Sequence, residues 1–465
     1  MKKYDVVVIG AGPGGYVAAI RASQNGLKTA IVDKQWLGGV CLNVGCIPSK
    51  ALLKNADLAY TLRNRAKEFG ISFDNLELDY GKAVKRSRGV SQRLTKGVGF
   101  LMKKNNIDVF MGQATLQAKD KIAVKLEDGN EEVLEAGNIV IATGAYSFSP
   151  PAWELDGEKV LSYTEAILQE KLPESAVIIG AGAIGAEFST IWNSYGTEVS
   201  LVEMLPNILP LEDAEVSKEL EKSFKKSGIN VLTGHKVESV DKTKNGVKVT
   251  VSSGDEQTVI EAEQALVAIG FHPNTETLGL DDVGVELDEK GNVIVDDTMA
   301  TNIPGIWAVG DVTGKLLLAH VASTQAILCA DAIAGKETHP INYKMVPSAT
   351  YCHPQVASFG MTEDEAKEAG YEVKIGKFAF RPNGKALGLG EVEGFAKIIV
   401  DAKYGEILGA ALIGPEVSEL LPELTLAQKM EMTAEEIAHN IHAHPTLSEV
   451  LMEAAEAIIG SPIHM

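Results

Sequence analysis

The sequence is poor in cysteine, with 4 among 465 residues. So few cysteines exclude a small secreted scaffold held by disulfides and favour a reducing compartment. The chain also has no apolar run near the ~20 residues that a membrane-spanning helix requires. Its first residues, MKKYDVVVIG, enter an apolar strand at once and leave no room for a targeting segment. We therefore expect a cytoplasmic protein with no membrane partner.

Basic residues are scarce as well. The chain has 43 Lys and Arg against 63 Asp and Glu, which gives a formal net charge of −20 at pH 7. A surface of this sign repels nucleic-acid phosphates and anionic lipids, so we expect no nucleic-acid partner. The rest of the composition is ordinary for a globular protein, and the length allows about three domains.

One motif occurs twice in the chain. YDVVVIGAGPGG (4–15) and SAVIIGAGAIGAE (175–187) each lead from an apolar strand through G-x-G-x-x-G into a helix-like stretch. The motif glycines are Gly10, Gly12 and Gly15 in the first copy and Gly180, Gly182 and Gly185 in the second. A second apolar strand then ends in an acid, Asp33 or Glu203, which lies 23 positions after the first glycine in both copies.

This arrangement is typical of dinucleotide binding. One glycine makes the tight turn, the next lets pyrophosphate approach the backbone at a helix N-terminus, and the third lets helix and strand pack closely. The acid accepts hydrogen bonds from a ribose. Because the two copies share their offsets, we predict two dinucleotide sites rather than two ordinary strand–turn–helix units. MLPNILP after Glu203 has no Arg or Lys for a 2′-phosphate, which favours NAD over NADP unless a basic residue from elsewhere folds in.

Later segments indicate how the domains are divided. NIVIATGA (138–145) and QALVAIGFHPN (264–274) are apolar strands that end in a glycine turn, and we expect the chain to cross between domains there. Asp311 ends the strand GIWAVGD, at the edge that faces the ligand in open α/β sheets. Alternatively Asp311 is a helix N-cap, because residues 312–335 have the pattern of one long helix. From about Lys344 the pattern predicts an antiparallel sheet with helices.

Two cysteines lie close together in GGVCLNVGCIPSK (38–50). In a regular helix the Cα atoms of Cys41 and Cys46 would be ~8–9 Å apart, whereas a disulfide needs them within ~7 Å. A bridged pair therefore requires a distorted helix, which Gly45 and Pro48 would permit. So short a loop gains little stability from a bridge, and reversible redox chemistry is the better reason for the pair.

Zinc binding is the alternative for these cysteines. A structural zinc site needs four ligands. Cys329 lies in a predicted helix as a small buried hydrophobic residue, and Cys352 adjoins His353 without a second Cys/His cluster. We therefore expect no metal.

Here the chain resembles a known family. The cysteine segment after a first dinucleotide turn resembles the flavin-dependent pyridine nucleotide-disulfide oxidoreductases of class I, and CLNVGCIPSKALL is most similar to the dihydrolipoamide dehydrogenases among them. HAHPTLSE (442–449) is similar to their C-terminal His-Pro-Thr-x-Ser-Glu signature. The resemblance covers the whole chain in order. It departs at Val40, where threonine is more usual, and at Asp33, where glutamate is more usual.

The resemblance implies an α/β fold with two Rossmann-like dinucleotide-binding domains and a C-terminal α+β dimerisation domain. The FAD-binding domain would span residues 1–146 and the NAD-binding domain 147–272. Residues 273–344 would complete the FAD-binding region, and 345–465 would form the interface of a homodimer. The implied reaction is oxidation of protein-bound dihydrolipoyl groups with reduction of NAD⁺. The implied partners are lipoyl domains of 2-oxo acid dehydrogenase acyltransferase components or the glycine-cleavage carrier protein.

The resemblance also assigns roles in catalysis. Cys41 would be attacked by the substrate thiolate, and Cys46 would face the flavin. His444 would take the substrate's proton, oriented by Glu449, and in the homodimer it would complete the partner's site. Alternatively, Glu449 only closes a T-x-x-E capping box with Thr446. Lys50 and Glu187 would pair near flavin N5, and His442 would only support the site.

The remaining expected contacts divide between the two cofactors. Those expected for FAD are Gly10, Gly12, Gly14, Gly15, Asp33, Lys50, Gly112, Thr143, Gly144, Asp311, Leu317, Leu318, Ala319 and His320. Those expected for NAD are Gly180, Gly182, Ile184, Gly185, Glu187, Glu203, Val237 and Gly270.

Other NAD(P)H-dependent flavin disulfide reductases are the alternative function. A glutathione-type reductase would carry basic residues after Glu203, and a mercuric reductase would carry a C-terminal cysteine pair, which SPIHM lacks. A diaphorase without dithiol chemistry would not need Cys41, Cys46 and His444.

Overall fold

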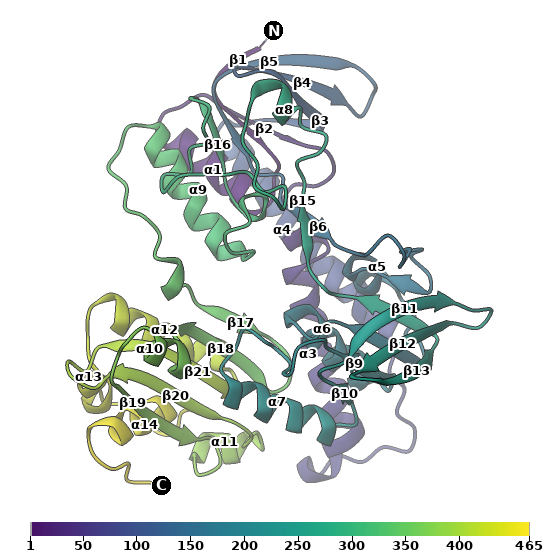
Figure 1. Cartoon of the computed structure of the whole chain (residues 1–465), viewed down its shortest axis with the longest axis vertical. Coiled ribbons are helices and arrows are strands. Elements are labelled where there is room, and N and C mark those ends of the chain that lie inside the picture. Colours follow the sequence, from purple (N-terminus) through teal and green to yellow (C-terminus); the bar gives the residue numbers. More distant parts are fainter. Residues whose placement is uncertain (1, 465) are drawn as a thin grey trace.

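The computed structural model describes residues 2–464 and divides into three regions, each built around a main sheet of its own (Figure 1). The first region lies at the top of the figure. Its strands are β1 (Lys2–Ile9), β2 (Thr29–Asp33), β3 (Asp108–Ala118), β4 (Lys121–Leu126), β5 (Glu131–Ile141) and β16 (Ile306–Ala308). Five of them pair in parallel in the order β3-β2-β1-β5-β16, while β3, β4 and β5 also form an antiparallel meander.

This first sheet is covered on both faces, which explains why β1 is a nearly continuous apolar run. Val6 and Val8 pack among α1 (Pro13–Gln24), α4 (Tyr80–Lys104) and α9 (Ala319–Ile333). Val7 and Ile9 pack under the meander and α8 (Leu280–Val283).

The second region lies to the right in Figure 1 and carries the second glycine motif. Its parallel sheet has the order β10-β9-β8-β14-β7, and a three-stranded antiparallel sheet β11-β12-β13 lies beside it. The strands are β7 (Val160–Leu161), β8 (Ser175–Ile179), β9 (Glu198–Val202), β10 (Asn230–Leu232), β11 (Lys236–Lys242), β12 (Val247–Ser253), β13 (Glu256–Ala262) and β14 (Gln264–Val267). The helices are α5 (Tyr163–Leu168), α6 (Ala183–Tyr195) and α7 (Ala214–Lys226).

The chain crosses between these regions twice, at neighbouring positions. β6 (Ala145–Ser147) leads out of the first region, β15 (Phe271–Pro273) leads back, and the two pair antiparallel. β16 then joins the first sheet beside β5, so the first region is assembled from two separate stretches of sequence.

The segment after β16 contradicts one prediction. Residues 312–335 are not one helix. A 3₁₀ turn, η3 (Asp311–Thr313), ends at Gly314, which has a φ of 64°, and α9 begins only at Ala319. The glycine's left-handed backbone breaks the helix, so Asp311 is not the N-cap of α9.

The third region carries an antiparallel sheet in the order β17-β18-β21-β20-β19. The strands are β17 (Ser348–Thr350), β18 (Gln355–Gly360), β19 (Val373–Ala379), β20 (Phe395–Asp401) and β21 (Ile407–Gly414). The helices are α10 (Glu363–Glu368), α11 (Gly384–Leu389), α12 (Val417–Lys429), α13 (Ala434–His439) and α14 (Glu449–Ile459). β20 and β21 are buried along their whole length, because α12–α14 cover one face and the second region covers the other.

The predicted fold class is confirmed by these three regions. One helix joins the first region to the second: α3 (Cys46–Tyr60) packs against α4 of the first region and α6 of the second. α3 continues into the short helices η1 (Thr61–Arg65) and η2 (Ala66–Phe69), and η4 (Tyr343–Met345) precedes β17. Within residues 2–464, no helix combines the length and apolarity needed to cross a bilayer.

Candidate active site

Both glycine motifs form the tight turns that the sequence predicts. Gly10 and Gly180 have left-handed backbones, with φ of 102° and 97°. A Cβ on Gly15 would lie 1.8 Å from the Gly10 oxygen, and one on Gly185 would lie 1.9 Å from the Gly180 oxygen. Only glycine therefore allows each helix to start so close to its preceding strand.

The first turn is approached by a second glycine segment. A Cβ on Gly39 would lie 2.5 Å from the Gly12 Cα, so the start of α2 (Gly39–Asn43) touches the start of α1 backbone to backbone. No side chain caps the N-terminus of α1. Its free N–H groups are therefore available to an anionic ligand.

The two acids at the second strands have equivalent contacts. Asp33 Oδ2 accepts from the Ala11 N–H at 2.6 Å, and Glu203 Oε2 accepts from the Ala181 N–H at 2.8 Å. Each acid thus binds the residue that follows the first motif glycine. The shorter Asp33 reaches its turn as well as Glu203 does, so the Asp33 departure leaves this contact intact.

A cavity of ≈ 620 Å³ extends from the first glycine turn to the second region. It is lined by most residues expected at the flavin and by two expected at the nicotinamide nucleotide. The predicted residues in its lining are Gly10, Gly12, Gly14, Asp33, Cys41, Cys46, Lys50, Gly112, Thr143, Gly144, Ile184, Glu187, Asp311, Leu317, Leu318 and Ala319. Val40, at the other family departure, also lines it.

The other predicted residues lie outside this lining. Those in the second region are Gly180, Gly182, Gly185, Glu203, Val237 and Gly270, of which the first four form the second glycine turn and its acid. Gly15 packs against Gly10, and the exposed His320 contacts the Pro347 oxygen at 2.8 Å.

Asp311 supports the fit of an elongated dinucleotide to the cavity. Its burial raises the pKa of its carboxyl to about 6, and no donor among residues 2–464 reaches that carboxylate. Hydroxyl groups of a ligand would supply the missing hydrogen bonds. Together with the glycine cradle at Gly12 and Gly39, this acceptor suits a molecule with a phosphate and a polyhydroxyl chain.

The cysteine segment is a broken helix, as a bridging pair requires. Cys41 lies in α2 and Cys46 begins α3, with Val44 and Gly45 between the two helices. Both cysteines are free thiols in this structure, so the disulfide itself stays a prediction. Cys329 and Cys352 are also free and are buried elsewhere, as expected for Cys329.

The negative charge of the reduced pair belongs on Cys46. A hydrogen bond from the Cys41 thiol lowers the pKa of Cys46, and the charge of Lys50 lowers it further against the opposing effect of burial. The same hydrogen bond, together with burial, raises the pKa of Cys41. Cys46 also lies at the N-terminus of α3, where the helix dipole favours an anion.

Lys50 and Glu187 form the predicted ion pair. Lys50 Nζ lies 2.8 and 2.9 Å from the two Glu187 carboxylate oxygens, and the Glu187 side chain is only 6% exposed. The pair joins α3 to α6 at the wall of the cavity. The sequence did not reveal a third member: the Tyr351 N–H donates to Glu187 Oε1 at 3.1 Å, and its ring lies 4.5 Å from Lys50 Nζ.

His444 and Glu449 contact each other but not the cavity. His444 Nδ1 lies 2.9 Å from Glu449 Oε1, while Glu449 Oε2 accepts from the Thr446 N–H at 2.8 Å. The Glu449 carboxylate therefore contacts the Thr446 backbone and the His444 imidazole at the same time. Thr446 does not complete the capping box, because its hydroxyl donates to the Ala443 oxygen and α14 begins at Glu449.

Within the described chain, neither His444 nor Glu449 lines the cavity, and the His444 side chain is 76% exposed. His442 instead contacts Glu423, with Nε2 3.0 Å from its Oε1.

Aromatic residues of the lining were also missed, and Tyr163 and Phe271 are two of them. Tyr163 and Phe271 border the cavity on the side of the second region, with ring centroids 6.0 Å apart. Phe271 lies in the crossing segment QALVAIGFHPN, where β15 pairs with β6, but nothing in that segment pointed to its side chain.

Comparisons with known proteins identify the family and the fold. The family described as "Pyridine nucleotide-disulphide oxidoreductase" matches residues 4–326, and its dimerisation domain matches residues 346–455. Among curated relatives, the dihydrolipoyl dehydrogenase of Mycobacterium leprae (strain TN) is 52% identical over 100% of both chains. The dihydrolipoyl dehydrogenase of Corynebacterium glutamicum is 47% identical over 99% of both chains.

Solved structures agree in fold over nearly the whole chain. LpdA from Mycobacterium tuberculosis has a TM-score of 0.90 at 28% identity, covering 98% of this chain and 99% of that one. The Cu(II) complex of the HOCl-induced flavoprotein disulfide reductase RclA from Escherichia coli has a TM-score of 0.88 at 26% identity, covering 98% of this chain and 100% of that one. The chain therefore belongs to the pyridine nucleotide-disulphide oxidoreductase family.

Proposed function

We propose that this protein is a dihydrolipoyl dehydrogenase, which oxidises protein-bound dihydrolipoyl groups and reduces NAD⁺. The observation that carries the proposal is the cysteine pair at the cavity, with its anion on Cys46 beside Lys50. Dihydrolipoyl dehydrogenases that match the chain over its full length support it.

FAD would occupy the cavity and NAD the second glycine turn. The N-terminus of α1, Asp33 and Asp311 would hold the pyrophosphate, a ribose and the polyhydroxyl chain of FAD. Gly182 and Glu203 would hold NAD. When bound, FAD accepts an electron pair from the dithiol and passes it as hydride to NAD⁺.

The cysteines take the electron pair from the substrate in two exchanges. In the oxidised enzyme a substrate thiolate attacks Cys41, forming a mixed disulfide and releasing Cys46 as the thiolate. Cys46 is the better leaving group because its pKa is the lower of the two. The second substrate thiolate then attacks the substrate sulfur of the mixed disulfide, which releases the oxidised lipoyl group and leaves Cys41 reduced.

His444 would remove the proton from the substrate dithiol. With a proton on Nδ1 donated to Glu449, the imidazole keeps Nε2 free as the base. Because His444 is exposed and outside the cavity of its own chain, we assign it to the cysteines of a second chain in a homodimer. The match to the dimerisation domain supports this arrangement.

The substrates would be lipoyl domains of 2-oxo acid dehydrogenase acyltransferase components or the glycine-cleavage carrier protein, in the cytoplasm. A lipoyl arm suits the site because only its dithiol has to reach Cys41.

Steady-state reduction of NAD⁺ by dihydrolipoamide tests the proposal. Cys46→Ser should lower kcat by about 10³-fold or more while flavin stays bound, because the electron pair no longer has a path from Cys41. Cys329→Ala, at a buried cysteine outside the cavity, is the matched control and should keep activity. NADP⁺ should be a poor substitute for NAD⁺. Full activity of Cys46→Ser, or no activity of the unmodified protein with dihydrolipoamide, would refute the proposal.

A further inference from the structure

Tyr351 contacts both members of the Lys50–Glu187 pair from the third region. Its backbone N–H donates to Glu187 Oε1 at 3.1 Å, and its ring centre lies 4.5 Å from Lys50 Nζ. An ammonium at this distance is attracted to the negative face of an aromatic ring. Lys50 is therefore held on one side by a carboxylate and on another by an aromatic face.

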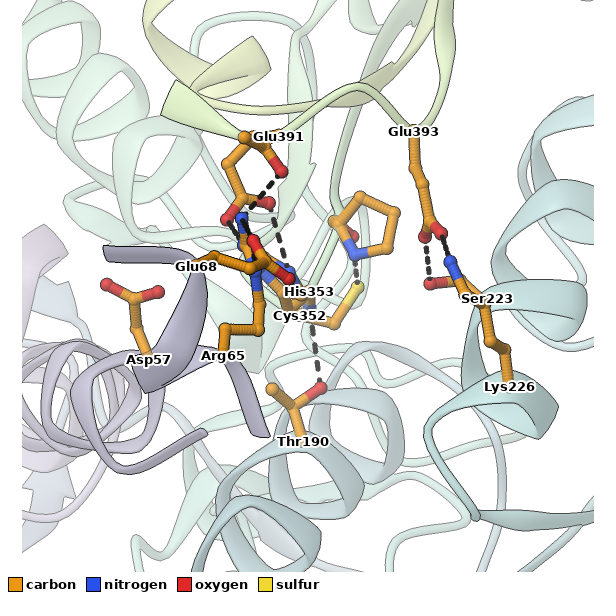
Figure 2. A network of polar contacts seen from close by, with 12 residues as sticks. Asp57, Arg65, Glu68, Thr190, Ser223, Lys226, Cys352, His353, Glu391 and Glu393 are labelled. Carbon is orange, nitrogen blue, oxygen red and sulfur yellow. Dashed lines mark hydrogen bonds and ion pairs between the residues drawn. The ribbon is translucent and has the colours of Figure 1, made fainter. Parts of the chain in front are cut away.

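The residues that follow Tyr351 fix its position. Cys352 is buried, and its thiol contacts the Pro354 oxygen at 3.2 Å. The His353 N–H donates to Thr190 Oγ1 at 3.4 Å, and its Nε2 lies 3.3 Å from Glu391 Oε2. Figure 2 shows His353 between these two partners.

The same cluster ties all three regions together. Glu391 also pairs with Arg65 of η1, and Thr190 belongs to α6. The backbone at Tyr351 is thus attached to the helix that carries Glu187 and to the end of the helix that carries Lys50. It has little freedom to move away from the pair.

Lys50 needs such positioning because its side chain is long, flexible and 33% exposed. It lies one helical turn after Cys46 on the same face of α3, and both side chains line the cavity. Its charge favours the thiolate of Cys46, whereas the charge of Glu187 opposes it. The pKa of Cys46 therefore depends on where the Lys50 ammonium is held.

We propose that Tyr351 is a positioning residue that keeps the Lys50 ammonium beside the Cys46 sulfur. The ring performs this role, because no group among residues 2–464 hydrogen-bonds its hydroxyl. A contribution of Tyr351 to catalysis rests on the proposed dithiol function. The effect on Cys46 itself does not require that function.

The test compares the Cys46 thiol in variants of the flavin-bound protein, all carrying Cys41→Ser so that Cys46 is the only thiol of the pair. The rate of Cys46 alkylation by iodoacetamide is measured against pH, with the modified peptide identified by mass spectrometry. Tyr351→Leu and Tyr351→Met should raise the apparent pKa of Cys46 by about half a unit, which is the scale of one cation–π contact. Tyr351→Phe keeps the ring and should leave the pKa unchanged.

Lys50→Met is the reference for complete loss of the charge and should shift the pKa in the same direction by more. An unchanged pKa in both Tyr351→Leu and Tyr351→Met would overturn the proposal, as would a shift in Tyr351→Phe equal to theirs. Two ring-free variants are used so that poor folding of one does not decide the result. Failure of the proposed function would instead appear as no oxidation of dihydrolipoamide by the unmodified protein.

Discussion

The carboxylate of Asp311 lacks hydrogen-bond donors among the described residues of the protein alone. Its carboxylate is largely buried at the cavity wall, and desolvation raises its pKa from 3.8 to about 6. An acid with a raised folded-state pKa lowers stability wherever it is ionised in both states. The protein therefore keeps Asp311 at the expense of its own stability, which is typical of a residue that binds a ligand.

The first prediction concerns this residue. In flavin-free protein, Asp311→Asn should raise the free energy of unfolding by about 1–3 kcal/mol above pH 6. The gain should shrink as pH falls through about 6 and vanish below about 4, where Asp311 is protonated in both states. Urea unfolding across this pH range measures it. The same variant should bind flavin less tightly, and equal stability of the two proteins at all pH values would contradict the role of desolvation.

Other single residues could not be found from the sequence. The spacing of the cysteines drew attention to that pair, and the family resemblance pointed to Lys50 and Glu187 inside the two motifs. Tyr351 lies 164 positions from Glu187, and it meets the ion pair only through its backbone N–H and its ring face. Neither contact leaves a pattern in the local sequence, so only the folded chain reveals it.

At the scale of elements, the close approach of the starts of α1 and α2 shapes one end of the cavity. Gly12 and Gly39 let the two helix starts touch without a side chain between them. Gly45 and Pro48 were expected to permit a distorted helix at the cysteine pair, and the structure breaks the helix between α2 and α3. The same kind of signal at Gly314 was outweighed in the prediction by the apolar, helix-like pattern of residues 312–335, and there the prediction was wrong.

The second prediction tests this close approach with a matched pair of glycines. Gly39 and Gly26 both have left-handed backbones, with φ of 59° and 86°, but a Cβ on Gly26 would meet nothing within 4 Å. Gly39→Ala and Gly26→Ala should each lose about 1 kcal/mol of stability from backbone strain. Only Gly39→Ala should also lose bound flavin, because its Cβ would force α2 away from the start of α1.

The ratio of flavin to protein absorbance after gel filtration measures this loss, and thermal unfolding measures the strain. Equal flavin content in the two variants would show that the close approach does not shape the cofactor site.

At the scale of the whole molecule, the third region is buried against the second through one face of its sheet (Figure 1). His444 of that region nevertheless lies outside the cavity lining of its own chain. The order of the three regions followed from the motifs. The position of His444 relative to the cysteines did not, because no sequence pattern places one region against another. If a second copy of the chain completes the site, the exposed His444 of one copy can serve as the base at the cavity of the other.

The third prediction follows from this arrangement. Cys46→Ser and His444→Gln should each abolish dihydrolipoamide oxidation, but a mixed dimer of the two variants has one site with both residues intact. Refolding the variants together at equal amounts should restore about a quarter of the unmodified activity, because half of the dimers then carry one of two working sites. Sites built within single chains would instead give no recovery.

The most direct test of the account is an anaerobic titration of the air-oxidised flavoprotein with dihydrolipoamide, followed by alkylation and mass spectrometry of the cysteine peptides. We predict that Cys41 and Cys46 are joined before the titration. One equivalent of dihydrolipoamide should convert both to alkylatable thiols, with release of one equivalent of lipoamide. Two thiols already free in the oxidised protein, or a bridge that dihydrolipoamide leaves intact, would contradict it.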